Sequence, residues 1–326
     1  MSNLENEIVE LNKTTTGAEE KEEGGFIKTK PVVKIEPISR RKVIVISSGI
    51  LFALIVISLV VHYLLGSPFA ESFSFMEIFS DWRFLEYAMV GFLAQMIDGA
   101  LGMAYGVTST SFLMSFGVSP AAASAGVHVS KVFTSGVSGW AHYQFGNVNK
   151  KLFKKLILPG MIGAIAGALL LSYVDGKAIK PFVSAYLVLM GIMIIQKAFK
   201  KVTKKKKTKN LGPLGFVGGF VDSIGGGGWG PVVTSTLLSR GRNPKYTIGS
   251  VNLAEFFVAI ASAATFVMLL ELDNWLVVFG LIAGGVLAAP LAALVVGKVK
   301  PKYLMIVVGA LIILLSVRNI VLAIAS

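Results

Sequence analysis

The chain has 326 residues, of which 54% are apolar and 15% charged, and its mean hydropathy is +0.72. This composition is typical of a polytopic α-helical membrane protein rather than a soluble enzyme. The net charge of +13 does not indicate nucleic-acid binding, because the basic residues form short clusters between apolar segments, and the absence of cysteine excludes thiolate catalysis, disulfides and cysteine-ligated metals.

The N-terminal part divides into a polar and an apolar stretch. Residues 1–42 are rich in both acidic and basic side chains and lack hydrophobic periodicity, which predicts a disordered tail. Residues 43–65 contain no ionised side chain and are long enough for one N-terminal transmembrane helix. We expect the tail to lie on the cytoplasmic side.

An internal repeat follows. A shift of 124 residues, the separation of Asp98 and Asp222, places residues 91–133 over residues 215–257 without a gap. The shift also matches glycines, hydroxyl residues and prolines: Gly102 with Gly226, Gly106 with Gly230, Thr110 with Thr234, Ser111 with Ser235, and Pro120 with Pro244. We predict two transmembrane repeats, residues 86–199 and 211–326, joined by a basic cytoplasmic linker at residues 200–210.

Each repeat begins with an apolar segment that glycines interrupt, near Gly102 to Gly106 and at Gly225 to Gly228. Glycine costs about 0.5–1 kcal/mol and proline about 3 kcal/mol relative to alanine in a helix interior, so these segments should break into half-helices. Three segments long enough to cross a membrane follow in each repeat: 119–141, 152–173 and 181–199, then 246–270, 274–297 and 303–325.

The basic loops favour one of two threadings for the broken segments. A continuous span would place the lysines of residues 150–155 on the extracytoplasmic side, whereas a re-entrant hairpin places them and the linker on the cytoplasmic side. The second threading agrees with the enrichment of Lys and Arg in cytoplasmic loops. Half-helices of about 12 residues rise roughly 18 Å, enough to reach the middle of the bilayer core. The predicted fold is therefore an all-α inverted repeat, each half a hairpin plus three transmembrane helices, which is the general plan of a secondary transporter.

These elements resemble the TauE/SafE family, the sulfite/sulfonate exporters, over about residues 86–325. The glycine-rich turn from Gly225 to Pro231, the element at residues 117–120 and the stretch at residues 142–148 are similar to the family pattern. The resemblance implies a multi-pass transporter of sulfur-containing oxyanions or organosulfonates in the cytoplasmic membrane of a prokaryote.

The chain departs from the family pattern in two places, which indicates a specialised substrate. Met103, Ala104 and Val107 replace glycines and a proline in the first turn. His128 and Lys131 stand in a helix that small hydroxyl residues commonly occupy in the family.

The shift of 124 residues places His128 on Asn252 and Lys131 on Glu255. Each pair has a three-residue spacing, which puts both members on one helical face. In one interpretation Lys131 supplies charge to an anionic substrate, His128 and Asn252 donate hydrogen bonds, and Glu255 exchanges a proton. In the other, Lys131 and Glu255 form a structural ion pair between the halves.

The hairpin tips supply further candidates, because the N-terminus of each second half-helix has free backbone N–H groups that attract anions. The predicted substrate-binding residues there are Gly102, Tyr105, Gly106, Thr108, Ser109, Thr110, Gly226, Gly227, Gly228, Trp229, Thr234 and Ser235. The alternatives are that the hydroxyls bond to their own helix backbone or across to other helices, and that the two aromatic residues pack in the core.

Asp98, Asp222 and Glu255 are the acids within the apolar segments after residue 86, and we predict that they couple transport to protons. Asp98 and Asp222 have a second interpretation, as caps of the half-helix that follows each turn.

The sequence thus predicts a secondary transporter that moves a small anion by alternating access, with binding at the midplane. We expect the lipid bilayer, protons and a second copy of the chain as partners, and no cofactor, metal or nucleic acid. Two alternatives remain: a cation or neutral-solute carrier that uses the three acids, and a membrane scaffold that recruits partners through its tail.

Overall fold

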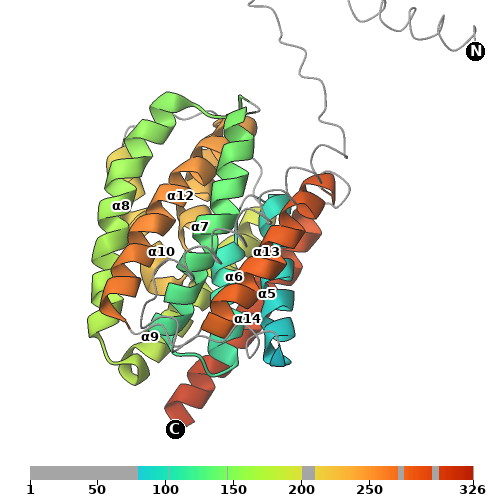
Figure 1. Ribbon diagram of the computed structural model, residues 1–326. Coiled ribbons are helices and arrows are strands. Elements are labelled where there is room, and N and C mark those ends of the chain that lie inside the picture. Colours follow the sequence, from blue (N-terminus) through green and yellow to red (C-terminus); the bar gives the residue numbers. More distant parts are fainter. Residues whose placement is uncertain are drawn as a thin grey trace, which may run out of the picture. The chain divides into compact units, whose positions relative to one another are not determined.

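The computed structural model describes residues 80–101, 103–144, 146–199, 210–270, 275–295 and 301–325. The regular elements in these ranges are all helices, which confirms the predicted all-α architecture for this part of the chain (Figure 1). The predicted tail, the predicted helix at residues 43–65 and the linker except Asn210 lie outside the described residues.

The first repeat begins with two helices that meet at a break. Helices α5 (Arg83–Leu101) and α6 (Tyr105–Ser115) are separated at the glycine-poor first turn, where Ala104 has a φ of 96° in the left-handed region. Three long helices follow: α7 (Pro120–Gln144), α8 (Lys150–Tyr173) and α9 (Gly176–Phe199). The break and the three helices lie where the sequence predicts them.

The second repeat has a corresponding order of helices. Helix α10 (Leu211–Gly225) ends at Gly226, whose φ of 65° an L-residue rarely adopts. The second arm consists of a π-helical turn, η1 (Gly230–Thr234), and α11 (Ser235–Ser239). It leads into α12 (Pro244–Leu269), α13 (Trp275–Val295) and α14 (Pro301–Ala325).

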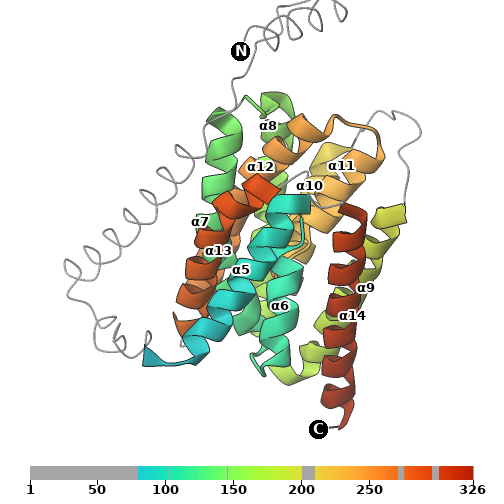
Figure 2. The same cartoon turned by 90° about the vertical axis from the view of Figure 1, so that its right-hand side faces the viewer.

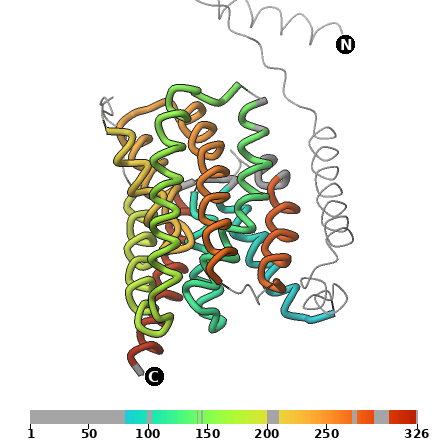
Figure 3. Tube along the Cα trace, turned by 60° about the vertical axis from the view of Figure 1, so that its left-hand side comes forward, coloured from blue at the N-terminus to red at the C-terminus, as the bar shows by residue number. Residues whose placement is uncertain are grey.

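Among the described residues, four helices are long and apolar enough to cross a membrane: α8, α9, α12 and, within α14, Lys302–Ile324. Helix α7 is as long as these but carries His128, Lys131 and several serines and threonines. Because such side chains are costly against lipid, α7 needs neighbours that cover its polar face. Helix α12 lies beside both α7 and α8 and covers part of this face (Figure 3).

The first helix of each repeat packs on a helix of the other repeat: α5 packs on α13, and α10 packs on α8. Helices α13 and α8 hold corresponding places in their repeats. Small residues bring these backbones together, as where Gly163 and Gly167 of α8 meet the backbone of Phe216 and Phe220 in α10. The equivalent helices α9 and α14 also lie side by side (Figure 2), with Gly191 facing Gly309.

The equivalent helices run in opposite directions where they pair. Along α7 and α12, Gly136 contacts Phe256 while Gly139 contacts Leu253, so the numbers rise on one helix as they fall on the other. A twofold axis along the membrane normal would make such pairs parallel. The antiparallel pairing is what an inverted repeat would produce.

Candidate substrate site and charge cluster

The two glycine-rich turns pack directly against each other. A Cβ atom on Gly106 would overlap the backbone of Gly226 and Gly227, and one on Gly230 would overlap Met103. Glycine is therefore needed here for contact between the tips, whereas we expected it to admit a ligand. Gly102 lies outside the described residues.

The acids before the two turns accept hydrogen bonds from the backbone beyond them. Asp222 Oδ1 accepts from the N–H groups of Gly228 at 2.6 Å and Trp229 at 2.9 Å, and Asp98 Oδ1 accepts from Tyr105 N–H at 3.2 Å. These are the capping contacts that the sequence left as an alternative. Because of them, three backbone N–H groups that we expected to be free for an anion are occupied in this structure.

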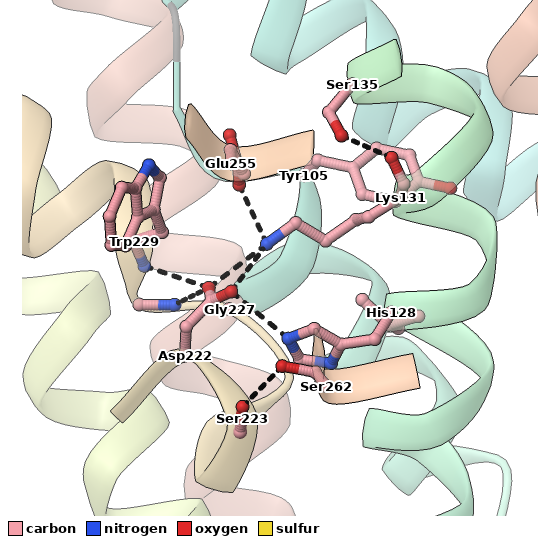
Figure 4. Close-up of polar contacts among 12 residues, drawn as sticks. Tyr105, His128, Lys131, Ser135, Asp222, Ser223, Gly227, Trp229, Glu255 and Ser262 are labelled. Carbon is pink, nitrogen blue, oxygen red and sulfur yellow. Dashed lines mark hydrogen bonds and ion pairs between the residues drawn. The ribbon is translucent and has the colours of Figure 1, made fainter. Parts of the chain in front are cut away.

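Asp222 also lies at the centre of a buried charge cluster, formed by His128, Lys131, Asp222 and Glu255 (Figure 4). Lys131 Nζ lies 3.0 Å from both carboxylate oxygens of Asp222 and 2.7 Å from Glu255 Oε1. The side chains of Lys131 and Asp222 are 3% and 0% exposed, so solvent does not screen their pairing. Sequence reasoning paired Lys131 with Glu255 and missed its contact with Asp222.

The hydrogen bonds of His128 locate its protons. Nδ1 lies 2.8 Å from the carbonyl oxygen of Ser124, which can only accept, so Nδ1 carries a proton. The Ser124 hydroxyl donates to Ser223 O at 2.5 Å and is not a donor to the ring. Nε2 lies 3.1 Å from Asp222 Oδ2. The His128 ring therefore links the backbone of α7 to the Asp222 carboxylate on α10.

A small cavity lies beside this cluster. Its volume of about 10 Å³ for the centres of water-sized molecules is close to the space that one water needs. Helices from both repeats line it, and five of its residues are among the sequence candidates: Asp98, Tyr105, Lys131, Asn252 and Glu255.

Four further lining residues escaped sequence reasoning: Gln95, Thr134, Ser135 and Ser138. Three of them follow Lys131 at intervals of three, four and seven residues, which is the spacing of one helical face. This periodicity was the signal that could have found them. Gln95 on α5 precedes Asp98 by three residues, so the same helical spacing could have found it.

The hydroxyls of the second half-helices do not line the cavity. Thr108, Ser109, Thr110 and Thr234 are at most 1% exposed, and their hydroxyl oxygens have no hydrogen-bond partner among the described residues. Ser235 Oγ lies 3.6 Å from Met103 Sδ. The Ser235 contact crosses between helices, and Ser111 Oγ donates to Val107 O at 2.7 Å within its own helix, so these two hydroxyls follow the alternative interpretation and the other four do not.

The two aromatic residues after the turns have different surroundings. Tyr105 lines the cavity, and its hydroxyl lies 3.1 Å from Ser130 Oγ. Trp229 is fully buried and donates from Nε1 to Val251 O at 3.1 Å, so it packs in the core as the alternative interpretation has it. Within the described residues, no group of three or more His, Asp or Glu is placed to hold a metal ion.

Comparisons with known proteins agree with this architecture. The family model "Sulfite exporter TauE/SafE" matches residues 87–319. A Bacillus subtilis (strain 168) protein named "Probable membrane transporter protein YtnM" is 45% identical over 249 residues, which cover 73% of this chain and 83% of that protein. No solved structure matches. The chain belongs to the TauE/SafE family and is a multi-pass membrane transporter.

Proposed function

We propose that the chain is a secondary transporter that moves a small anion, an organosulfonate or another sulfur-containing oxyanion, across the cytoplasmic membrane by alternating access. The observation that carries this proposal is the position of Lys131. Its ammonium group from the first repeat is held between two acids of the second repeat, beside a cavity that both repeats line. A buried cation where two halves meet can bind an anion, and its ion pairs to the other half change when the halves move.

The cavity must enlarge before it accepts an oxyanion, since it has room for about one water. Separation of the packed tips would provide this space. It would also expose the hydroxyls of Thr108, Ser109, Thr110 and Thr234, which now lack partners. Buried hydroxyls without partners cost about 1–3 kcal/mol each, so they favour a state in which a ligand or water binds them.

Coupling to protons follows from the contacts of Lys131. Its three ammonium protons face three carboxylate oxygens, two on Asp222 and one on Glu255. An anion that binds Lys131 must displace one of them. Glu255 is the more accessible partner, at 14% exposure, and protonation of Glu255 would release Lys131 to the anion. We propose Glu255 as the first proton-coupling group, with Asp98 and Asp222 as the others.

One observation favours the rival function, a carrier of cations. Asp98 lines the cavity and has no basic side chain within ion-pair distance among the described residues. A carboxylate in that position attracts a positive group. The scaffold alternative depends on the tail, which lies outside the described residues.

Uptake into proteoliposomes tests the proposal with labelled sulfite, a labelled sulfonate and a monovalent cation. We expect anion uptake, and we expect Lys131→Gln to lower it by at least about tenfold, the equivalent of one buried charge contact. Lys150→Gln, at the exposed start of α8, is the matched control and should leave uptake unchanged. Flux of the cation alone would overturn the anion proposal.

A further inference from the structure

The ionisable groups at the centre of the helices do not balance in charge. Lys131 is paired with the two acids Asp222 and Glu255, and Asp222 is also bonded to His128. Asp98 is the fifth group, and no described cation lies within ion-pair distance to offset it.

Asp98 is positioned so that an occupant of the cavity meets its charge. It lies near the end of α5 and lines the cavity, and its one hydrogen bond to a described residue comes from Tyr105 N–H at 3.2 Å. A carboxylate that is partly buried without a cation is destabilised, because the protein interior solvates charge poorly. The cavity is therefore matched to an occupant with a positive group.

Two neutral side chains offer contacts for the other end of such an occupant. Gln95 and Thr134 line the same cavity, are 4% and 3% exposed, and make no side-chain hydrogen bond to a described residue. The amide N–H groups of Gln95 and the hydroxyl of Thr134 are donors for an oxyanion. Because both side chains line the cavity, water or a ligand there can take up these donors.

We infer that the transported anion also carries a primary ammonium group, so that the substrate is a small zwitterion of the aminosulfonate type. The ammonium pairs with Asp98, while the sulfonate or related oxyanion binds Lys131 as proposed above and accepts further hydrogen bonds from Gln95 and Thr134. This inference rests on the proposed function and narrows its substrate class. A zwitterion brings no net charge into the cavity, whereas sulfite would add an anion without offsetting Asp98.

Two near-isosteric sulfonates test the inference. 2-Aminoethanesulfonate and 2-hydroxyethanesulfonate differ in the group that would face Asp98. The half-saturating concentration for each is measured by uptake into proteoliposomes of the full-length protein at one pH. We expect the amino compound to saturate uptake at about tenfold lower concentration, which corresponds to one favourable charge contact.

Asp98→Asn removes the charge and keeps an oxygen that can accept from Tyr105 N–H. We expect this variant to take up both sulfonates with equal half-saturating concentrations. Asp98→Glu retains the charge and should retain the preference, which distinguishes loss of charge from loss of fold. Glu86→Gln makes the same change of charge on α5 outside the cavity and is the matched control.

The outcomes distinguish failure of the inference from failure of the proposed function. Equal uptake of both sulfonates by the unchanged protein, or a preference that survives in Asp98→Asn, would overturn the inference. The former result would leave an anion transporter in which a proton neutralises Asp98. Failure of both sulfonates and of sulfite to be transported would instead overturn the proposed function.

Discussion

Asp98 and Asp222 occupy equivalent places in the two repeats, yet only Asp222 forms an ion pair with Lys131. Among the described residues, Asp222 has four hydrogen-bonding partners, in Lys131, His128 and the N–H groups of Gly228 and Trp229, whereas Asp98 has one. The equivalent acids of the two repeats therefore have different surroundings: Asp222 lies within the charge cluster and Asp98 faces the cavity.

This asymmetry predicts different stabilities for the two asparagine variants. Asp222→Asn leaves Lys131 with one acidic partner in a buried setting, so we expect the free energy of unfolding to fall by about 3 kcal/mol. Asp98→Asn removes an unpaired carboxylate and should change it by less than about 1 kcal/mol. Chemical unfolding in detergent measures both, and equal losses would contradict the asymmetry.

Glu255→Gln tests proton coupling. The variant keeps the size of the side chain and an oxygen near Lys131, but it can no longer exchange a proton. We expect transport by the unchanged protein to respond to an imposed pH gradient and transport by the variant to lose that response. Glu86→Gln should behave like the unchanged protein, because Glu86 does not line the cavity. A variant that still responds to the gradient would exclude Glu255 as the coupling group.

Contact between the tips predicts that added bulk there is destabilising. A methyl group at Gly227 would overlap the backbone of Gly106 and Val107, so Gly227→Ala should lower the free energy of unfolding by about 1–3 kcal/mol. Gly126→Ala is the control, since its methyl group would meet Val277 and Val278 at 3.5 Å and 3.7 Å, an ordinary contact. The midpoints of thermal unfolding are measured for Gly227→Ala and Gly126→Ala. Equal midpoints would show that the tips tolerate separation.

Opening of the tips can be followed by thiol labelling, because the chain has no cysteine of its own. Ser109 is fully buried, so Ser109→Cys should react with a membrane-impermeant maleimide only when the tips separate. We expect a saturating substrate to change its labelling rate. Ser119→Cys, at an exposed position, should react quickly in all conditions. Labelling of Ser109→Cys that is as fast as that of Ser119→Cys would contradict a closed tip.

The arrangement of the helices was predictable from the sequence, because it depends on patterns that are local or repeated. The apolar segments gave the long helices, and the match of Asp98 with Asp222 marked both breaks. The pairing of Lys131 with Glu255 followed from the same match and is present at 2.7 Å.

The contacts at the breaks were not predictable in the same way. That Gly106 packs on Gly226 depends on how two turns 120 residues apart in the numbering meet, and no local pattern encodes it. The contact of Asp222 with Lys131 likewise joins α10 to α7 across the repeats. Sequence reasoning placed the tip glycines correctly but assigned them to a ligand, because it could not see the opposite tip.

The contact of Gly106 with Gly226 and Gly227 has a mechanical consequence. The two tips meet backbone to backbone, with no compressible side chain between them, so displacement of one tip is transmitted to the other directly. Neither can move far while its neighbour stays in place. Such an interlock couples the two repeats mechanically without a long relay of side chains.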